Sequence, residues 1–381
     1  MDTEVRRSTA SGSSLRERAQ ALLDRADLRI DGDRRFDMRV HDERLFARVF
    51  AQGSLGLGEA YMDGWWDCEQ LDEFFHRILR ARLQEAIQPW REIPRVVIAK
   101  LLNLQTPGRS YRVGEHHYDI GNDLYERMLG RYAVYSCGYW REAESLDEAQ
   151  AAKMDLICRK LGLEPGMRVL DIGCGWGELA YHMAAHYGAE VVGVTISREQ
   201  VDYGQRLCAE LPVDIRLQDY RALDDTFDRI VSVGMFEHVG YKNYATFMDV
   251  ARRCLAPGGL FLLHTIGGNR STTVTDPWIA RYIFPNSMIP SVNQVTDAVE
   301  GRFIIEDWHN FGTDYDRTLL AWYANFEAHW PELAGHYSER FYRMWRYYLL
   351  SCAGSFRARQ NQLWQIVLSP SGVPGGYRSV R

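Results

Sequence analysis

One short stretch, Arg168–Gly177 (RVLDIGCGWG), constrains the fold of this chain more than any other feature. Three of its first five residues, Val169, Leu170 and Ile172, are apolar, and two of these are β-branched, which is typical of a buried strand. Three glycines follow, and a helical pattern then runs from residue 178 to 187. A turn of this kind brings backbone amides and a helix N-terminus close to a ligand. Asp171 ends the strand, at the edge where open α/β sheets bind their ligands.

The spacing of Gly173, Gly175 and Gly177 narrows the class of ligand. A dinucleotide-binding turn has its third glycine three positions after the second, whereas these glycines stand at alternate positions. With an acid just before the first glycine, the pattern resembles the first motif of the S-adenosylmethionine-dependent methyltransferases. No Lys-Ser/Thr pair follows it, so a nucleoside triphosphate is not the expected ligand. The alternative is a purely structural strand-to-helix turn.

Strand and helix patterns alternate after this motif, with short turns between them. This alternation predicts an α/β fold of the class I methyltransferase type, with a Rossmann-like, mostly parallel sheet and helices on both faces. The irregular stretch 267–290 contains three prolines, which prevent a long helix. Further strands are predicted at 190–196, 214–218, 227–234, 260–266, 302–307 and 363–368, and helices at 146–161, 197–211, 241–255, 315–330 and 338–359.

The whole chain divides into four predicted regions. The first is polar, rich in Ser and Thr and without an apolar core, which indicates a disordered tail and not a signal peptide. Within the second, the glycines of residues 53–58 are expected to break a helix. The regions are the tail (1–14), a small helical N-terminal domain (15–90), a basic apolar segment with a linker (91–114), and a catalytic domain (115–381) with a helical cover (268–360).

The segment Pro89–Gln105 and its flank combine apolar residues with basic ones. Residues 91–115 carry five basic and two acidic side chains on a chain whose net charge is −6. A basic apolar segment on an acidic protein is a candidate surface for anionic lipid. A core helix whose basic side chains reach solvent is an equally good interpretation.

Bulk properties exclude several classes of protein. The acidic net charge argues against a nucleic-acid partner. The seven cysteines are scattered and form no Cys-x-x-Cys pair, which indicates reduced thiols, as in a cytoplasm, and neither a disulfide framework nor a zinc site. No apolar run approaches the roughly 20 residues that cross a bilayer. Any membrane contact is therefore expected to be peripheral.

Side chains at the carboxyl ends of the predicted strands should meet in one crevice. The first strand contributes Asp171 and the glycines. The second ends at Thr195, where many methyltransferases have an acid that holds ribose, so we expect the ribose contact from Gln200 or a backbone amide. The third strand ends at Asp219 and Tyr220, which are placed to hold adenine and stack on it.

Glu237 follows the fourth predicted strand, and His264 lies within the fifth. A carboxylate or imidazole beside a methyl donor usually serves as a base for a nucleophile. Each has a structural alternative, since Glu237 could cap a helix or pair with a cation and His264 could be a satisfied core histidine. Their presence at neighbouring strand ends favours a site. No third ligand follows at metal-binding spacing, so no metal is predicted.

Further segments carry a specific resemblance to a known family. In order and spacing the chain resembles the cyclopropane-fatty-acyl-phospholipid synthase family over essentially its whole length, and its N-terminal domain resembles that of the bacterial phospholipid enzymes. With residues 169–177, the segments are HHYDIGND (116–123), YSC (135–137), RIVSVGMFEHVG (229–240), HTI (264–266) and DWHNFGTDY (307–315).

This resemblance implies a reaction and a site. The methyl group of S-adenosylmethionine is added to a cis double bond of a phospholipid acyl chain, a carbocation forms, and a bound bicarbonate ion takes a proton so that a cyclopropane ring closes. The implied bicarbonate holders are Cys137, Glu237, His264, Ile266 (through its backbone) and Tyr315, with Glu306 orienting Tyr315. The implied cofactor contacts are Tyr135, Ser136, Gly173, Gly175, Thr195, Gln200, Asp219 and Tyr220, beside Asp171 and Gly177 of the motif.

Partners and location follow as expectations. The protein would contact a phospholipid bilayer with unsaturated acyl chains as a peripheral protein on its cytoplasmic, inner face, and pairing into a homodimer is a hypothesis. Two rival functions remain: a methyltransferase that leaves a methyl-branched acyl chain, and a non-catalytic lipid-binding protein. The first differs in the unsaturation of the product, and the second is disfavoured by the intact set of site residues.

Overall fold

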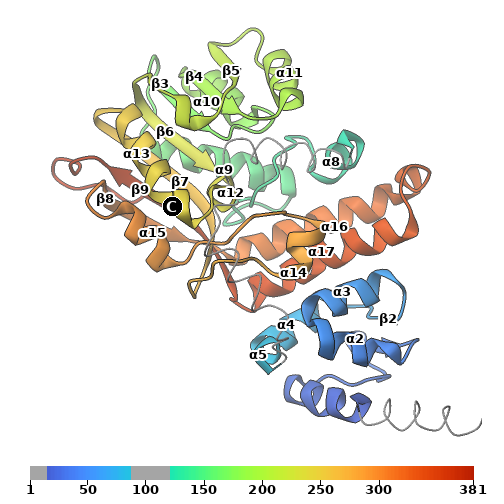
Figure 1. The fold of residues 1–381 in the computed structure, drawn as a ribbon. Helices are drawn as coiled ribbons and strands as arrows, with labels where there is room; N and C mark the ends of the chain where they lie inside the picture. Colours follow the sequence, from blue (N-terminus) through green and yellow to red (C-terminus); the bar gives the residue numbers. More distant parts are fainter. Residues whose placement is uncertain (1–14, 87–120) are drawn as a thin grey trace, which may run out of the picture. The chain divides into compact units, whose positions relative to one another are not determined.

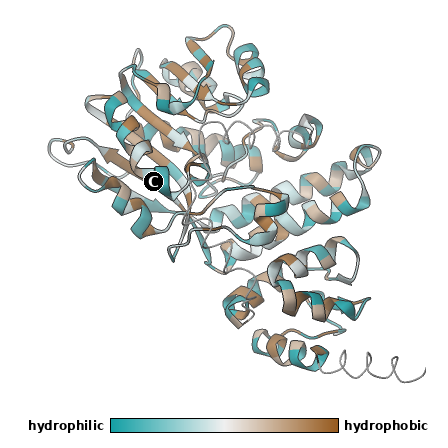
Figure 2. Ribbon diagram, in the orientation of Figure 1, coloured by the Kyte–Doolittle hydropathy of each residue, from teal (hydrophilic) through white to brown (hydrophobic). Residues whose placement is uncertain are grey.

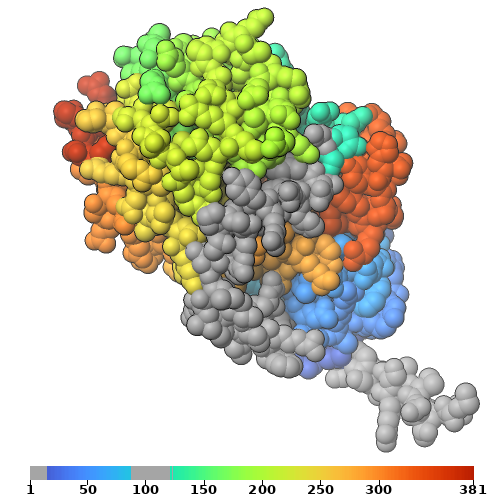
Figure 3. All heavy atoms as spheres, turned by 45° about the horizontal axis from the view of Figure 1, so that its top comes forward, coloured from blue at the N-terminus to red at the C-terminus, as the bar shows by residue number. Residues whose placement is uncertain are grey.

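The computed structural model describes residues 15–86 and 121–381, while residues 1–14 and 87–120 are grey in Figure 3. The segment Pro89–Gln105 lies outside the described residues. The chain forms two compact units. We call residues 15–86, 274–285 and 319–360 the helical unit, and residues 121–273, 286–318 and 361–381 the sheet unit. In the described part, no helix is long and apolar enough to cross a membrane.

The helical unit gathers segments that lie far apart in the sequence. Residues 15–23 are helical, and a small two-stranded sheet of β1 and β2 lies among the N-terminal helices. Helix α16 begins in the sheet unit and continues into this one. The other elements are η1 (Asp24–Ala26), β1 (Arg39–Val40), α2 (Arg44–Gln52), α3 (Ser54–Met62), β2 (Trp66–Asp67), α4 (Leu71–Arg80), α5 (Leu83–Ala86), α14 (Pro277–Tyr282), α16 (Thr313–Leu333) and α17 (Glu339–Arg357).

Glycines pack helix α3 closely against its neighbours. A Cβ added at Gly58 would collide with the indole of Trp278 on α14, and one at Gly56 would lie 2.5 Å from the Arg48 carbonyl oxygen on α2. The prediction that residues 53–58 break a helix is wrong beyond Gly53, whose φ of 60° does end α2. The later glycines instead serve close helix packing, a use that a local sequence pattern does not distinguish from a turn.

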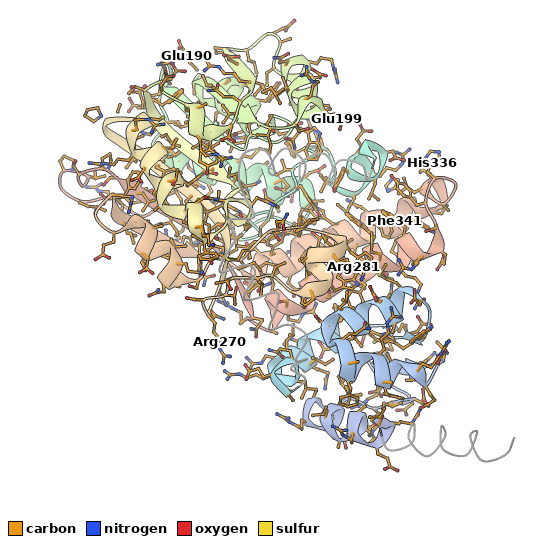
Figure 4. The ribbon with its side chains drawn as sticks, in the orientation of Figure 1. Glu190, Glu199, Arg270, Arg281, His336 and Phe341 are labelled. Carbon is orange, nitrogen blue, oxygen red and sulfur yellow. The ribbon has the colours of Figure 1, made fainter. Side chains whose placement is uncertain are left out.

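Aromatic rings and arginines hold α17 to the N-terminal helices within the helical unit. The Tyr61 ring lies 5.1 Å from Trp66 and 5.5 Å from Tyr347. Arg343 donates hydrogen bonds to the Tyr61 and Trp66 carbonyl oxygens at 2.6 and 2.9 Å. On α14, which Figure 4 marks by Arg281, this arginine pairs with the Glu59 carboxylate at 2.9 Å.

The sheet unit is a seven-stranded sheet with the order β5-β4-β3-β6-β7-β9-β8 (Figure 1). Strands β5, β4, β3, β6 and β7 are parallel, and β9 runs antiparallel to both β7 and β8. The mostly parallel sheet is therefore confirmed. Its strands are β3 (Arg168–Ile172), β4 (Glu190–Thr195), β5 (Val213–Leu217), β6 (Phe227–Val233), β7 (Leu255–Gly268), β8 (Ile304–Asn310) and β9 (Asn361–Ser369).

Helices connect these strands, and two of them have the predicted bounds. Helix α9 spans Leu146–Leu161 and α10 spans Glu178–Tyr187. Helices α8, α12 and α15 were not predicted, although Ser291 and Gln294 form a capping box at the start of α15. The remaining helices of this unit are α8 (Asn122–Met128), α11 (Arg198–Leu207), η3 (Tyr220–Ala222), α12 (Phe236–Val239), η4 (Tyr241–Asn243), α13 (Tyr244–Cys254) and α15 (Val292–Val299).

Successive residues of the central strands belong to two different cores. Leu170 and Phe261 pack in one core with residues of α13 and α15. Val169 and Leu262 pack in a second core with residues of α9, α10 and α11. Side chains alternate between the faces of a strand, so both faces of the sheet are covered, as predicted. Figure 2 shows hydrophobic colour along these strands and mixed colour around the helices.

The compact units divide the chain differently from the predicted regions. The sequence grouped residues 268–360 with the catalytic domain, whereas residues 274–285 and 319–360 share a compact unit with the N-terminal helices. The sequence signals for secondary structure are local, and they carry no record of which distant helix fills a given apolar face.

Candidate active site

The glycine turn after β3 has the backbone that its sequence predicts. Gly173 and Gly177 adopt φ values of 84° and 90°, which side chains disfavour. A Cβ at Gly173 would lie 2.7 Å from the Met235 side chain, whereas one at Gly175 would meet nothing within 4 Å. The turn is anchored to β4, because Gly173 N and Cys174 N both donate to the Val194 carbonyl oxygen at 2.9 and 3.1 Å. Its open side can accept a ligand against the backbone.

Aromatic rings stand beside this turn. The Tyr125 ring lies 5.7 Å from Trp176, which belongs to the glycine turn, and 5.3 Å from Tyr135 in an edge-on arrangement. Tyr135 is half-buried. The predicted cofactor residue Tyr135 is thus linked to the glycine turn by aromatic contacts, and these ring faces could stabilise a sulfonium cation.

Asp171 lies at the end of β3, buried and close to a lysine. It is 1% exposed, and neither carboxylate oxygen has a hydrogen-bond partner among the described residues. Burial raises the pKa of Asp171 to about 7, and the charge of Lys153 opposes this shift. A buried carboxylate without partners is costly, so it marks a position where a ligand is expected to complete the hydrogen bonds.

Lys153 of α9 connects Asp171 with the segment that precedes the helix. Its ammonium donates to the Ser136 hydroxyl at 2.9 Å, and the neighbouring Gln150 amide donates to the Ser136 carbonyl oxygen at 2.8 Å. Burial lowers the pKa of Lys153 to about 7. The predicted cofactor residue Ser136 is therefore fixed from two sides, and it lies near the end of β6, since a Cβ at Gly234 would be 4.0 Å from the Ser136 Cβ.

Sequence reasoning missed Lys153, although a signal was present. Within α9 the buried positions recur at helical spacing, and Gln150, Lys153 and Lys160 fall among them. A charged residue on the apolar face of a predicted helix is rarely buried without a partner. That conflict would have singled out both lysines.

Thr195 and Gln200, the predicted ribose contacts, bind each other. The Thr195 hydroxyl donates to Gln200 Oε1 at 2.6 Å and accepts from the Ser197 amide at 3.2 Å. Both side chains are buried, and Ser197 caps the helix that carries Gln200. The Thr195 hydroxyl already donates its one proton inside the protein, so it could meet a ribose hydroxyl only as an acceptor, and the Gln200 amide group stays the expected ribose contact.

The structure places Asp219 and Tyr220 just after β5, with partners of their own. The Asp219 carboxylate caps η3 and accepts from the backbone and side chain of Arg221. Tyr220 is 7% exposed and packs edge-on against Phe247 at 5.3 Å. Both residues lie at the predicted sheet edge, but their side chains serve the local structure as well as any ligand.

Glu237 lies on α12, directly after β6, and is held by β7. The Ile266 amide donates to Glu237 Oε1 at 2.6 Å, while Oε2 is buried without a hydrogen-bond partner among the described residues. Burial raises the pKa of Glu237 to about 7. The backbone therefore fixes one carboxylate oxygen and leaves the other to a ligand. The other backbone group of Ile266, its carbonyl oxygen, accepts from the Thr265 hydroxyl at 3.1 Å.

His264 lies on β7, buried and neutral. Its Nδ1 is 3.2 Å from Nε2 of Gln365 on β9, and its Nε2 is buried without a hydrogen-bond partner among the described residues. Burial, reinforced by the charges of Lys153 and Lys160, holds the pKa of His264 well below its ordinary value. The interpretation of His264 as a satisfied core histidine does not account for this unpartnered nitrogen.

Cys137 and Tyr315 are buried in the segments that flank this edge of the sheet. The Cys137 thiol is 3.1 Å from the Gly138 carbonyl oxygen and 3.9 Å from the Thr318 hydroxyl. Burial raises the pKa of Cys137 well above the ordinary value for a thiol, which disfavours a nucleophilic role. Tyr315, 9% exposed, lies in the first turn of α16, three residues before Thr318.

Glu306 has partners other than those expected. Its Oε1 accepts from the Ser369 hydroxyl at 2.5 Å and from the Val373 amide at 2.8 Å. It therefore anchors the segment that follows β9, which replaces the expected role of orienting Tyr315.

Together these residues form a buried polar edge with a defined chemical capacity. The unpartnered atoms of Asp171 and His264 belong to β3 and β7 of one sheet, and that of Glu237 belongs to α12, which directly follows β6 of the same sheet. Lys153 is close enough to affect the pKa values of Asp171, Cys137 and His264. Such an edge can hold polar ligand groups and accept a proton, and it fits the motif for a methyl donor.

Comparisons with known proteins agree with this chemistry. A family model described as mycolic acid cyclopropane synthetase matches residues 105–366. A cyclopropane-fatty-acyl-phospholipid synthase of Escherichia coli (strain K12) is 56% identical over 364 residues, which cover 95% of this chain and 95% of that protein.

Solved structures of mycobacterial enzymes have the same fold. The cyclopropane synthase MmaA2 from Mycobacterium tuberculosis superposes with a TM-score of 0.65 and 32% identity, covering 70% of this chain and 99% of that one. The mycolic acid cyclopropane synthase CmaA1 complexed with SAH and CTAB gives a TM-score of 0.63 at 33% identity, covering 68% of this chain and 97% of that one.

Proposed function

The chain belongs to the mycolic acid cyclopropane synthetase family, and we infer that it is an S-adenosylmethionine-dependent cyclopropane-fatty-acyl-phospholipid synthase. It transfers a methylene group to the cis double bond of an unsaturated acyl chain of a phospholipid. The structural observation that carries this inference is the pair of unpartnered buried atoms, Glu237 Oε2 and His264 Nε2, at the edge that also bears the glycine turn.

The residues of this edge fit the methyl donor. When bound, S-adenosylmethionine supplies an electrophilic methyl group on a cationic sulfur. The glycine turn would approach it through backbone, and the Asp171 oxygens, which have no hydrogen-bond partner among the described residues, would accept hydrogen bonds from it. We assign Tyr135 and Ser136 to the same ligand, with the Gln200 amide group at its ribose and Asp219 and Tyr220 toward its base.

The chemistry requires a proton acceptor and a dry site. The π electrons of the alkene form a new carbon–carbon bond to the methyl group as its bond to sulfur breaks, which leaves S-adenosylhomocysteine and a carbocation on the acyl chain. Loss of one proton from the added methyl group supplies the electron pair that closes the ring. Water would intercept the cation, so it must be excluded. Tyr139, Trp140 and Phe311, each less than 10% exposed, are suited to that task.

We propose that a bicarbonate ion takes this proton. Once the Glu237 carboxyl group is ionised, its Oε2 would accept a hydrogen bond from the hydroxyl of bicarbonate. The Nε2–H of His264 would donate a hydrogen bond to another bicarbonate oxygen. The Cys137 thiol, the Ile266 backbone and Tyr315 complete the proposed set of holders. The buried, unpartnered atoms of Glu237 and His264 support this assignment, because each needs a polar partner that the described chain does not provide.

We also propose how the protein meets its lipid. It contacts the inner face of the membrane peripherally, since its substrate resides in a bilayer, and pairing into a homodimer is part of the same hypothesis. Flotation of the full chain with anionic and neutral vesicles tests the membrane contact, because an electrostatic contact weakens as salt increases. Binding that depends on neither lipid charge nor salt would contradict an electrostatic contact.

Sedimentation equilibrium of the full chain tests whether it forms a homodimer.

Product analysis tests the proposed function. The protein, S-adenosylmethionine and vesicles of a cis-monounsaturated phospholipid should yield an acyl chain heavier by one CH₂ group, with cyclopropyl proton signals and no double bond. The same mass with a double bond retained would support the methyl-branched rival. Unchanged lipid, with the cofactor bound, would refute the assignment of an acyl substrate.

A matched pair of variants tests the role of Glu237. Glu237→Gln removes the charged acceptor and should abolish ring formation while S-adenosylmethionine still binds. Glu306→Gln changes a half-buried carboxylate whose partners are Ser369 and Val373, and it should retain activity. Equal losses in both variants would contradict a specific role for Glu237.

A further inference from the structure

A row of polar side chains crosses the sheet beside the active site. His264 on β7 is the register partner of Gln365 on β9, and Gln365 is the register partner of His309 on β8. Register partners point their side chains to the same face of a sheet, with Cβ atoms roughly 5 Å apart. Gln365 is fully buried. It is a polar residue between two buried apolar ones, Trp364 and Ile366, in β9.

The first contact in this row fixes a proton. Gln365 Nε2 lies 3.2 Å from His264 Nδ1. An amide nitrogen only donates hydrogen bonds, so Nδ1 must accept and cannot carry a proton. A neutral imidazole carries one proton, which must then be on Nε2. Nε2 is the atom of His264 that has no hydrogen-bond partner among the described residues.

At the other end of the row, His309 also has a nitrogen donor beside its Nδ1. Lys160 Nζ lies 3.0 Å from His309 Nδ1; when this lysine is protonated it only donates, and His309 then carries its proton on Nε2. Gln365 Oε1, an acceptor, is buried and has no hydrogen-bond partner among the described residues. His309 is therefore not hydrogen-bonded to this oxygen, and the amide orientation rests on the contact between Gln365 Nε2 and His264 Nδ1.

We propose that Gln365 is a positioning residue that holds His264 as the tautomer with its proton on Nε2, so that this ring donates a hydrogen bond into the active site. The proposal rests on the proposed function, in which His264 binds an anionic proton acceptor. The ring then supports the anion without competing for the proton that leaves the methyl group. Gln365 does not touch the reacting atoms, and it acts only through His264.

Nitrogen NMR of the wild-type protein gives the first test. Spectra of ¹⁵N-histidine-labelled protein distinguish a protonated ring nitrogen from a bare one, and loss of a signal in His264→Asn assigns the residue. We expect a bare Nδ1 and a protonated Nε2 that persist between about pH 6 and pH 8, the range in which an ordinary histidine changes charge. A protonated Nδ1 would overturn the proposal, whatever the activity.

Substitutions give the second test. Gln365→Met keeps the length of the side chain but cannot donate, so both tautomers should appear. We expect kcat to fall by about 10- to 100-fold, as it does when the partner that orients a metal-binding histidine is removed. Gln365→Glu should accept from Nδ1–H and reverse the tautomer, with the larger loss. The KM for S-adenosylmethionine should stay unchanged in both, because the glycine turn is intact.

Gln362→Met is the matched control. Gln362 is also buried on β9, but its Oε1 accepts from Asn310 at 3.1 Å and its register partner is Gly267. This variant should keep the wild-type tautomer and kcat. A tautomer change in Gln365→Met without any loss of kcat would refute the positioning role. Failure of the wild-type protein to make a cyclopropane would refute the proposed function separately, because the tautomer is read without turnover.

Discussion

Lys153 and Lys160 lie two turns apart on helix α9 and differ only in their neighbours. Both are at most 2% exposed, and burial lowers the pKa of each to about 7. Lys160 faces a closed network in which Asp307 is 3.7 Å away and has further partners in Ser379 and Arg381. Lys153 faces Asp171, whose oxygens have no hydrogen-bond partner among the described residues. A buried charge indicates a ligand site only where its surroundings are incomplete.

The largest expected effect is on activity at the incomplete end. Lys153→Met should lower kcat/KM for S-adenosylmethionine by up to about 100-fold, because Ser136 loses a hydrogen bond and Asp171 loses its nearby cation. Steady-state kinetics and calorimetric cofactor binding measure this loss. The same substitution at Lys160 should leave the kinetics close to wild type. Similar losses at both positions would remove the distinction between them.

The next largest effect is on stability, and it is expected to be larger at Lys160 than at Lys153. Lys160→Met should raise the free energy of unfolding by about 2 kcal/mol near neutral pH, since it removes a poorly solvated ammonium while Arg381 still pairs with Asp307. Urea unfolding measures the change. Lys153→Met should gain less, because Asp171 then lies buried without a cation. Destabilisation by Lys160→Met would show that the closed network depends on this lysine.

The pH dependence sharpens the same comparison. The native pKa of Lys160 is about 7 and its unperturbed value is 10.5, so between these values the unfolded chain binds more protons. Wild-type stability should therefore rise with pH in that window, by up to about 1 kcal/mol per unit. Lys160→Met lacks this contribution, so its advantage should shrink as the pH increases. Parallel stability curves from about pH 7 to pH 9 would contradict the depressed pKa.

The smallest expected effect concerns the outer partner of the closed network. Arg381 donates to both oxygens of Asp307 at 2.6 and 2.8 Å, but its own side chain is 35% exposed. Arg381→Ala should lower the free energy of unfolding by about 1 kcal/mol and leave kcat unchanged. Thermal unfolding at fixed pH measures this effect. A loss of activity without a loss of stability would instead connect the network to the reaction.

The sequence predicted those parts of the fold that depend on local patterns. The bounds of α9 and α10, the glycine turn, and the positions of Glu237 and His264 near strand ends all follow from periodicity, capping and spacing. These features depend on residues within a few positions of one another.

Other features depend on contacts between distant segments. Gln365 looked like one polar residue in an apolar strand, and only its pairing with His264 across β7 and β9 shows what it contacts. Gly56 and Gly58 looked like helix breakers until α2 and α14 were seen against them. Gln365 and Gly58 have their neighbours about 100 and 200 positions away, and even the neighbour of Gly56 is on another helix, so no local pattern specified these contacts.

The helical unit is assembled from segments that lie far apart in the chain, and this affects how the protein folds during synthesis. Its N-terminal helices complete their aromatic core with α17, which follows them by more than 250 residues. A ribosome would release those helices long before their partner is synthesised, and chains that wait in this way expose apolar surface. The sheet unit also needs β9, which is synthesised after α17. Neither unit is complete until nearly the whole chain has emerged, which predicts late, joint folding and a need for chaperones during translation.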